Sequence, residues 1–158
     1  MRGTTLIMSL FFTAITALPQ GLSPSINYCA GNKQTIGHCE VLSYVDTTTS
    51  ASNPPTVKEC QEACWSVFMD AGDWAVPLAG KPEGYRQRMV GSPCGFSIAA
   101  IPNTTHDFSF AMDNQDIADI IDEVVKRFAP LHGGRVAAEG TVRCDGHEAK
   151  WWVSRDAR

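Results

Sequence analysis

The segment from Asp113 to Cys144 constrains the fold more than any other, because the spacing of its apolar residues changes from helical to extended. In its first half, apolar residues follow the spacing that places side chains along one stripe of a helix. These residues are Ile117, Ile120, Ile121, Val124, Val125 and Phe128. From Arg135 onward the period becomes two, and one face then carries Val136, Ala138, Gly140, Val142 and Cys144. The segment predicts a helix that leads into a strand with one buried side and a cysteine at its end.

Capping signals mark the ends of two helices. Asp113 or Asn114 can cap the helix just described, and Pro130 ends it. Thr56 and Glu59 have the Thr-x-x-Glu spacing of a capping box, in which each residue satisfies a free backbone N–H of the other. This pattern predicts a second helix that runs to about residues 69–70.

Alternating segments predict a mostly antiparallel sheet. Strands are expected at residues 39–46, 74–78, 94–101, 108–112 and 150–153, while residues 85–89 fit a short strand or an ordered loop equally well. The turn at residues 102–105 predicts that the strands on either side of it form a hairpin. Asp145-Gly146 predicts a tight turn before the last strand. The fold class is therefore α+β, with two main helices on one face of the sheet.

The first residues have the pattern of a secretory signal peptide. Arg2 precedes an apolar run from Leu6 to Leu18, and small residues suit cleavage after Ala17, with a site a few residues later as the alternative. We therefore expect a signal peptide at residues 1–17, a short tether at 18–27 and a single disulfide-rich domain at 28–158. No other stretch is apolar enough to predict a membrane span, so the mature protein is expected to be extracellular.

Export changes how the cysteines are interpreted. An even number of cysteines in an oxidising compartment predicts three disulfides. Fifteen pairings are possible, although Cys60 and Cys64 lie one helical turn apart and point toward external partners rather than each other. The spacing does not favour zinc, and we predict no metal or cofactor. The cysteines are Cys29, Cys39, Cys60, Cys64, Cys94 and Cys144.

Charge and modification signals narrow the function classes. The formal net charge of −4 argues against a nucleic-acid-binding protein. Asn103-Thr104-Thr105 is an intact N-glycosylation sequon, which predicts a glycoprotein with this loop at the surface. The acids Asp119, Asp122 and Glu123 are interpreted as the solubilising face of a helix rather than as a catalytic pair.

One basic and aromatic segment is the best candidate for partner binding. Lys81, Tyr85, Arg86 and Arg88 lie in a stretch rich in glycine and proline, where arginine and tyrosine can form interface contacts. The alternative interpretation is a solvated loop.

The tryptophans add a second clue to the surface. Trp151 and Trp152 are adjacent in a strand and must face opposite sides, so one belongs to the core and the other covers a helix or marks a contact surface. Trp65 and Trp74 are expected in the core or at a helix seam.

An enzymatic alternative needs a proton relay. Of the four histidines, none has the sequence context of a catalytic motif, although His106, Glu59 and Arg86 could be assembled into the site of a secreted ribonuclease. A third alternative, a structural or adhesion role, predicts a contiguous exposed apolar patch.

Several segments together resemble a known family. They are Glu59-Cys60, Pro93 to Phe96, the Asp-x-x-Asp-Ile-Ile-Asp helix that begins at Asp116, and Gly134 to Cys144. Their order resembles the fungal necrosis-inducing effector domain, which is related to a secreted effector of leaf-mould fungi and to the virally encoded killer toxin of smut fungi. The resemblance covers roughly residues 60–153. It implies a two-layer α/β sandwich and an apoplastic effector with a role in host cell death or in antagonism of other microbes.

Together these features predict a secreted effector or killer-toxin-like virulence protein. We expect it to be a monomer without catalytic residues, acting by binding a host or microbial protein or cell-surface target. The sequence does not identify that target. The runner-up is a small secreted hydrolase such as a ribonuclease.

Overall fold

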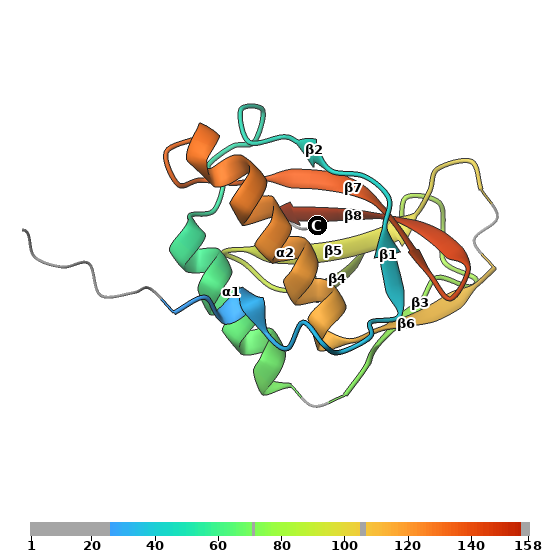
Figure 1. The fold of residues 1–158 in the computed structure, drawn as a ribbon. Helices are drawn as coiled ribbons and strands as arrows, with labels where there is room; N and C mark the ends of the chain where they lie inside the picture. Colours follow the sequence, from blue (N-terminus) through green and yellow to red (C-terminus); the bar gives the residue numbers. More distant parts are fainter. Residues whose placement is uncertain (1–25, 71, 105–106, 156–158) are drawn as a thin grey trace, which may run out of the picture.

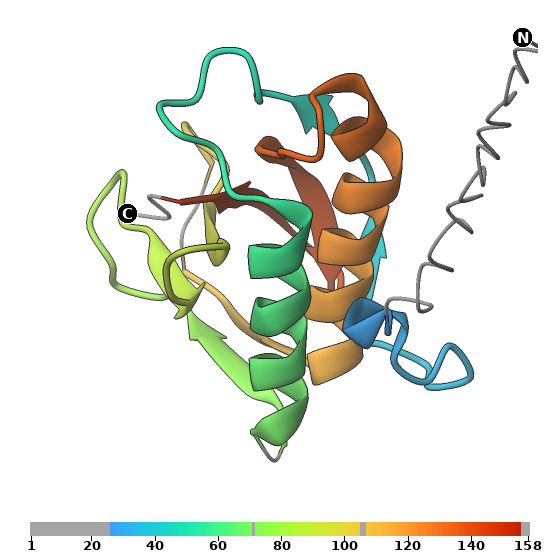
Figure 2. The same ribbon diagram turned by 90° about the vertical axis from the view of Figure 1, so that its left-hand side faces the viewer.

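The computed structural model describes residues 26–70, 72–104 and 107–155. The predicted signal peptide and most of the predicted tether lie outside these residues. In the described part, two α-helices lie side by side over one face of an antiparallel sheet (Figures 1 and 2). This is the predicted two-layer α+β fold. Its elements are η1 (Tyr28–Ala30), β1 (Cys39–Val41), β2 (Val45–Asp46), α1 (Val57–Met69), β3 (Trp74–Pro77), β4 (Gln87–Val90), β5 (Gly95–Ala100), β6 (Ser109–Met112), α2 (Asn114–Phe128), η2 (Ala129–Leu131), β7 (Ala138–Cys144) and β8 (His147–Ser154).

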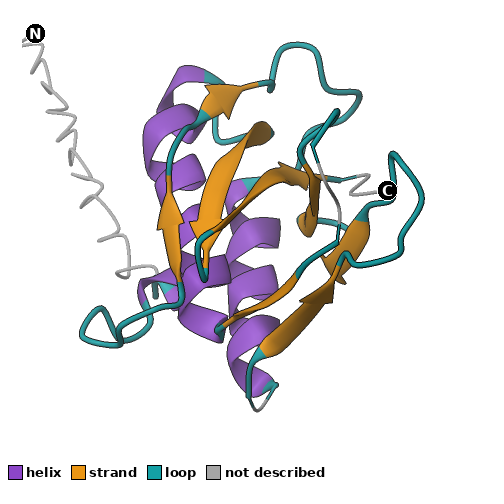
Figure 3. Ribbon diagram, turned by 90° about the vertical axis from the view of Figure 1, so that its right-hand side faces the viewer, coloured by secondary structure: helices purple, strands orange, loops and turns teal. Residues whose placement is uncertain are grey.

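The strands of the described residues form a large and a small sheet (Figure 3). The large sheet has the order β1-β7-β8-β5-β4, and β2 also pairs with β7. Strands β3 and β6 form the small sheet. The predicted turn at Asp145-Gly146 connects β7 and β8, and both residues have positive φ, as a type I′ hairpin turn requires. The strand expected at residues 39–46 is two short strands, both paired with β7.

The predicted hairpin across residues 102–105 is wrong. Strand β5 pairs with β4 and β8, whereas β6 pairs with β3. The physical reason is the burial of β5, in which five of six residues are buried. A strand that is buried on both faces is favoured in the middle of a sheet, where it has neighbours on both sides.

Both helices begin at the caps that the sequence predicts, and the predicted capping box of α1 is confirmed. The hydroxyl of Thr56 accepts the N–H of Glu59, and the Glu59 carboxylate accepts the N–H of Thr56 at 2.7 Å. Asp113 and Asp116 form the same reciprocal pair at the start of α2. The first four backbone N–H groups of a helix lack partners within the helix, and the side chains of a capping box accept hydrogen bonds from N–H groups at the helix start.

The core lies between the helices and the large sheet. The predicted stripe of α2 is confirmed, because Ile117, Ile120, Ile121 and Val124 are fully buried. On the sheet, the buried face of β7 matches the predicted alternation, and Trp151 of β8 is fully buried.

All six cysteines form disulfides, as predicted, with the pairs Cys29–Cys64, Cys39–Cys144 and Cys60–Cys94. Two of these bonds hold α1, because Cys60 and Cys64 pair with different segments rather than with each other. One connects α1 to the N-terminal segment and the other connects it to the start of β5. The third bond joins register partners of β1 and β7. The disulfides therefore connect the helix layer, the sheet and the N-terminal segment.

Candidate partner-binding site

A pocket lies on the side of the large sheet that faces away from the helices. The segment between β3 and β4, yellow-green at the left of Figure 2, crosses this side. It forms one wall of a pocket of about 250 Å³, and β5, β8 and Pro102 supply the rest. We call this the Arg86 pocket. Its lining residues are Leu78, Lys81, Pro82, Glu83, Gly84, Tyr85, Arg86, Ala99, Ala100, Pro102 and Trp152.

Cationic side chains cover the aromatic rings around this pocket. The Cζ atom of Arg86 lies 3.6 Å from the centroid of the Trp152 ring, and Lys81 Nζ lies 5.0 Å from the centroid of Tyr85. The Tyr85 hydroxyl donates to Gln87 Oε1 at 2.7 Å. Contacts between a cation and a ring face are worth about 0.5–2 kcal/mol, more where water is excluded. These contacts order a segment that its glycines and prolines alone would leave open to many conformations.

Strand β8 supplies the surface on which Arg86 lies. The indole N–H of Trp152 donates to Glu139 Oε2 at 2.9 Å, and Lys150 donates to Glu139 Oε1 at 2.8 Å. Glu139 therefore fixes the orientation of the indole. Burial lowers the pKa of Arg86, while the negative charge of Glu139 acts in the opposite direction. The guanidinium thus has lost part of its hydration.

The structure brings three of the four predicted binding residues to one place. Lys81, Tyr85 and Arg86 line the pocket, whereas Arg88 is exposed on β4 and is absent from the lining. Their role in binding stays a prediction. Trp152 is not among the predicted site residues, although the alternation of β8 already places it on the opposite face from Trp151. Trp152 packs against Arg86 on the outer face of the sheet rather than against a helix.

The ribonuclease alternative gains no support from the described residues. Glu59 is occupied by the capping box and by Arg155, whose guanidinium donates to Oε2 at 2.8 Å. These hydrogen bonds, that of the Thr56 backbone above all, lower the pKa of Glu59 to about 2, so it is a poor proton acceptor at neutral pH. Arg86 lies on Trp152, and His106 lies outside the described residues.

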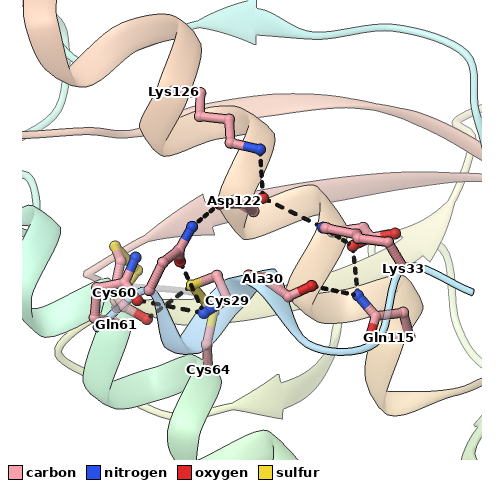
Figure 4. Close-up of a disulfide and its surroundings, with 12 residues drawn as sticks. Cys29, Ala30, Lys33, Cys60, Gln61, Cys64, Gln115, Asp122 and Lys126 are labelled. Atoms are coloured by element: carbon pink, nitrogen blue, oxygen red, sulfur yellow. Dashed lines mark hydrogen bonds and ion pairs between the residues drawn. A yellow bond between two sulfur atoms is a disulfide. The ribbon is translucent and has the colours of Figure 1, made fainter. Parts of the chain in front are cut away.

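The acidic face of α2 has a structural task that the sequence reasoning missed. The side chain of Asp122 is only 2% exposed, which corrects the expectation of a solubilising residue. It accepts hydrogen bonds from Lys126 at 2.7 Å, Asn27 at 3.1 Å and Lys33 at 3.2 Å (Figure 4). Burial by itself would raise the pKa of Asp122, but these three donors outweigh it and lower the pKa. Asp122 therefore fastens the N-terminal segment, next to Cys29, onto α2.

Helix α1 carries an exposed apolar ridge. Trp65, Phe68 and Met69 lie at helical spacing with 52%, 36% and 66% of their surface exposed. The expectation that Trp65 lies in the core or at a helix seam is wrong. Cys60, Cys64 and Val67 form the buried face of this helix, and Trp65 points away from it.

Within residues 26–70, 72–104 and 107–155, the structure has no group of three or more His, Cys, Asp or Glu side chains that could hold a metal ion. No helix in the same residues is long and apolar enough to cross a membrane.

The fold and site define a small disulfide-bonded α+β protein with a basic, aromatic pocket on its sheet. The chain belongs to the Hce2 family, whose model matches residues 38–144 and is described as "Pathogen effector; putative necrosis-inducing factor". This confirms the resemblance to necrosis-inducing effectors. The match begins at residue 38, whereas the resemblance seen in the sequence begins near residue 60. The matched residues include Cys39 and the segment between β3 and β4 that lines the pocket, but they end before Trp152. No curated protein matches the chain at a significant level.

Proposed function

We propose that this protein is a secreted effector that acts by binding a host or microbial target through the Arg86 pocket, without turning over a substrate. The observation that carries the proposal is the stacking of Arg86 on Trp152 at the mouth of the pocket. Tryptophan, tyrosine and arginine are the residue types that dominate binding energies at protein interfaces. The pocket combines all three.

Secretion is supported by the disulfides and by the family. Three disulfides persist in an oxidising compartment and are rare in the cytosol. A pathogen effector acts outside the cell that makes it, and the N-terminal residues have the pattern of a signal peptide. We infer that the mature chain is released as a monomer.

Two assays with the purified protein test this proposal. Infiltration into leaves measures necrosis, and addition to cultures of competing fungi measures growth inhibition. An active wild-type protein in either assay supports an effector role, and the positive assay identifies the target as host or microbial. Inactivity in both assays would refute the proposal.

The variant Arg86→Gln tests the pocket itself. An arginine at the centre of an interface contributes about 2 kcal/mol or more, so we expect the dose for a half-maximal response to rise at least about thirty-fold. Arg143→Gln is the matched control, because Arg143 is an exposed arginine of β7 that pairs with Glu40 and Glu148 outside the pocket. Equal activity of the two variants would exclude the pocket as the binding surface.

A further inference from the structure

The surface around the Arg86 pocket is basic, although the chain as a whole carries a formal net charge of −4. Lys81 and Arg86 line the pocket, Lys150 lies over the Trp152 ring, and Arg88 is exposed two residues after Arg86, against the two acids Glu83 and Glu139. Of these cations only Lys150 has a carboxylate within ion-pair distance among the described residues. The remaining positive charge is available to an acidic partner, and its field favours the approach of one.

Among the described residues, no acceptor or carboxylate pairs with the N–H groups of Arg86. A distance of 3.6 Å between Cζ and the ring centroid is the contact distance of two stacked flat groups, so the guanidinium face is covered by Trp152. The N–H groups lie around the rim of the guanidinium plane, where a carboxylate can accept two of them in parallel. Burial has already removed part of the hydration of this charge. A carboxylate that binds Arg86 therefore displaces less water than it would at a fully exposed arginine.

The pocket beneath these cations is apolar and small. Leu78, Ala99, Ala100 and Pro102 contribute its apolar lining, and Leu78 is only 1% exposed. A volume of about 250 Å³ is below the roughly 300–1,000 Å³ of pockets that enclose a whole small molecule. It suits one apolar side chain of a larger ligand.

Two other ligand classes fit less well. Sugars and bases bind by stacking on open aromatic faces, but cations already lie over the rings of Tyr85 and Trp152. A second cation, Lys150, has its Nζ 5.1 Å from the centroid of the Trp152 ring. A nucleic acid requires a long basic stripe, whereas this surface has only two more cations than acids.

We propose that the Arg86 pocket binds an acidic peptide segment of the partner, with a carboxylate on Arg86 and Lys81 and a neighbouring apolar side chain in the pocket. This inference rests on the proposed function, because it names the chemistry of the target that the effector recognises. It also explains why the cations stand at the rim of an apolar pocket. The carboxylate fixes the orientation of the peptide, and the apolar side chain adds burial.

A peptide array of defined composition tests this inference. Each synthetic nonapeptide carries a central glutamate, one apolar residue at a varied neighbouring position, and serine and glycine elsewhere. A matched array replaces the glutamate with glutamine, which keeps the shape and removes the charge. We expect the mature wild-type protein to bind the best glutamate peptides at least about ten-fold more tightly than their glutamine counterparts, and to need the apolar neighbour. Equal binding to both arrays, or no binding to either, would overturn the inference.

Variants connect the peptide to the pocket. Arg86→Gln should abolish the preference for glutamate and Arg143→Gln should retain it, with circular dichroism to verify that both are folded. Arg86→Lys should weaken binding, because lysine keeps the charge but loses the flat stack and the paired donors. An unchanged preference in Arg86→Gln would refute the assignment of the site.

Inorganic phosphate distinguishes a peptide site from a general anion site. We expect phosphate at about 10 mM to leave most peptide binding intact, since it cannot fill the apolar pocket. Complete displacement would mean that the pocket binds small anions and would overturn the peptide assignment. If activity in leaves or cultures depends on Arg86 while the arrays show no preference for glutamate, the proposed function stands and this inference fails.

Discussion

Replacement of Gly140 by alanine is expected to destabilise the protein by about 2–5 kcal/mol. A Cβ atom at this position of β7 would lie 2.0 Å from the carbonyl oxygen of Ser43 and 2.5 Å from the Trp151 ring. Gly140 is not among the glycines with positive φ, so the cost comes from lack of space and not from backbone strain. One added methyl group therefore requires a shift of backbone or of a packed indole.

Neither neighbour can move without breaking other contacts. Trp151 is fully buried, packs edge-on against Tyr44 at 5.3 Å between ring centroids, and donates its indole N–H to the Thr141 carbonyl. The backbone N–H groups of Leu42 and Ser43 also donate to the Thr141 carbonyl, at 2.9 and 3.3 Å. A shift of the Ser43 backbone would strain both hydrogen bonds. Overpacking costs about 1–3 kcal/mol and each lost hydrogen bond about 1 kcal/mol, which gives the stated range.

Thermal and urea unfolding, followed by near-ultraviolet circular dichroism, measure this effect. For a chain of this size the expected loss corresponds to a decrease in Tm of roughly 5–20 °C. Gly91→Ala is the matched control, because no atom of the described residues beyond its two chain neighbours lies within 4 Å of the added methyl group, and its φ is not positive. Gly91→Ala should leave stability unchanged or raise it by up to about 1 kcal/mol. If the two variants unfold at the same temperature, the packing of β7 against residues 42–44 is not as described.

Two further predictions concern charged groups with lowered pKa values. Because the pKa of Glu59 falls from an ordinary 4.5 to about 2 on folding, its stabilising effect is complete above pH 4.5 and is lost as the pH falls toward 2. Glu59→Gln should therefore be less stable than wild type at pH 7, and urea midpoints should converge near pH 2; a gap that is independent of pH would contradict this. Asp122→Asn should speed tryptic cleavage after Lys33, since it loosens the N-terminal segment. The control Asp119→Asn should change the cleavage rate less, because the Asp119 side chain is 44% exposed and water screens its ion pair with Lys33.

The candidate site was partly predictable from the sequence. The composition of the segment from Lys81 to Arg86 indicates a surface suited to binding, and the alternation of β8 requires that Trp151 and Trp152 face opposite sides. The contact between Arg86 and Trp152 was not predictable. It depends on how the segment between β3 and β4 crosses β5 and β8, and no local spacing records that path.

Features that depend on near neighbours in the chain were determined by the sequence alone. These features act over a few residues and can be read directly: the capping box of α1, the N-terminal cap and the buried stripe of α2, and the β7–β8 turn. The even number of cysteines and the apolar N-terminal run likewise predicted disulfides.

Tertiary structure alone decided which distant segments meet. It separated β5 from β6, selected one of fifteen cysteine pairings, buried Asp122 beneath the N-terminal segment and left Trp65 exposed. The same apolar alternation allows a strand to pair with several others, and the same helical spacing allows more than one face to be covered. The choice among them is made by the packing of the whole core, in which each strand must bury its apolar faces and each buried charge must find its donors.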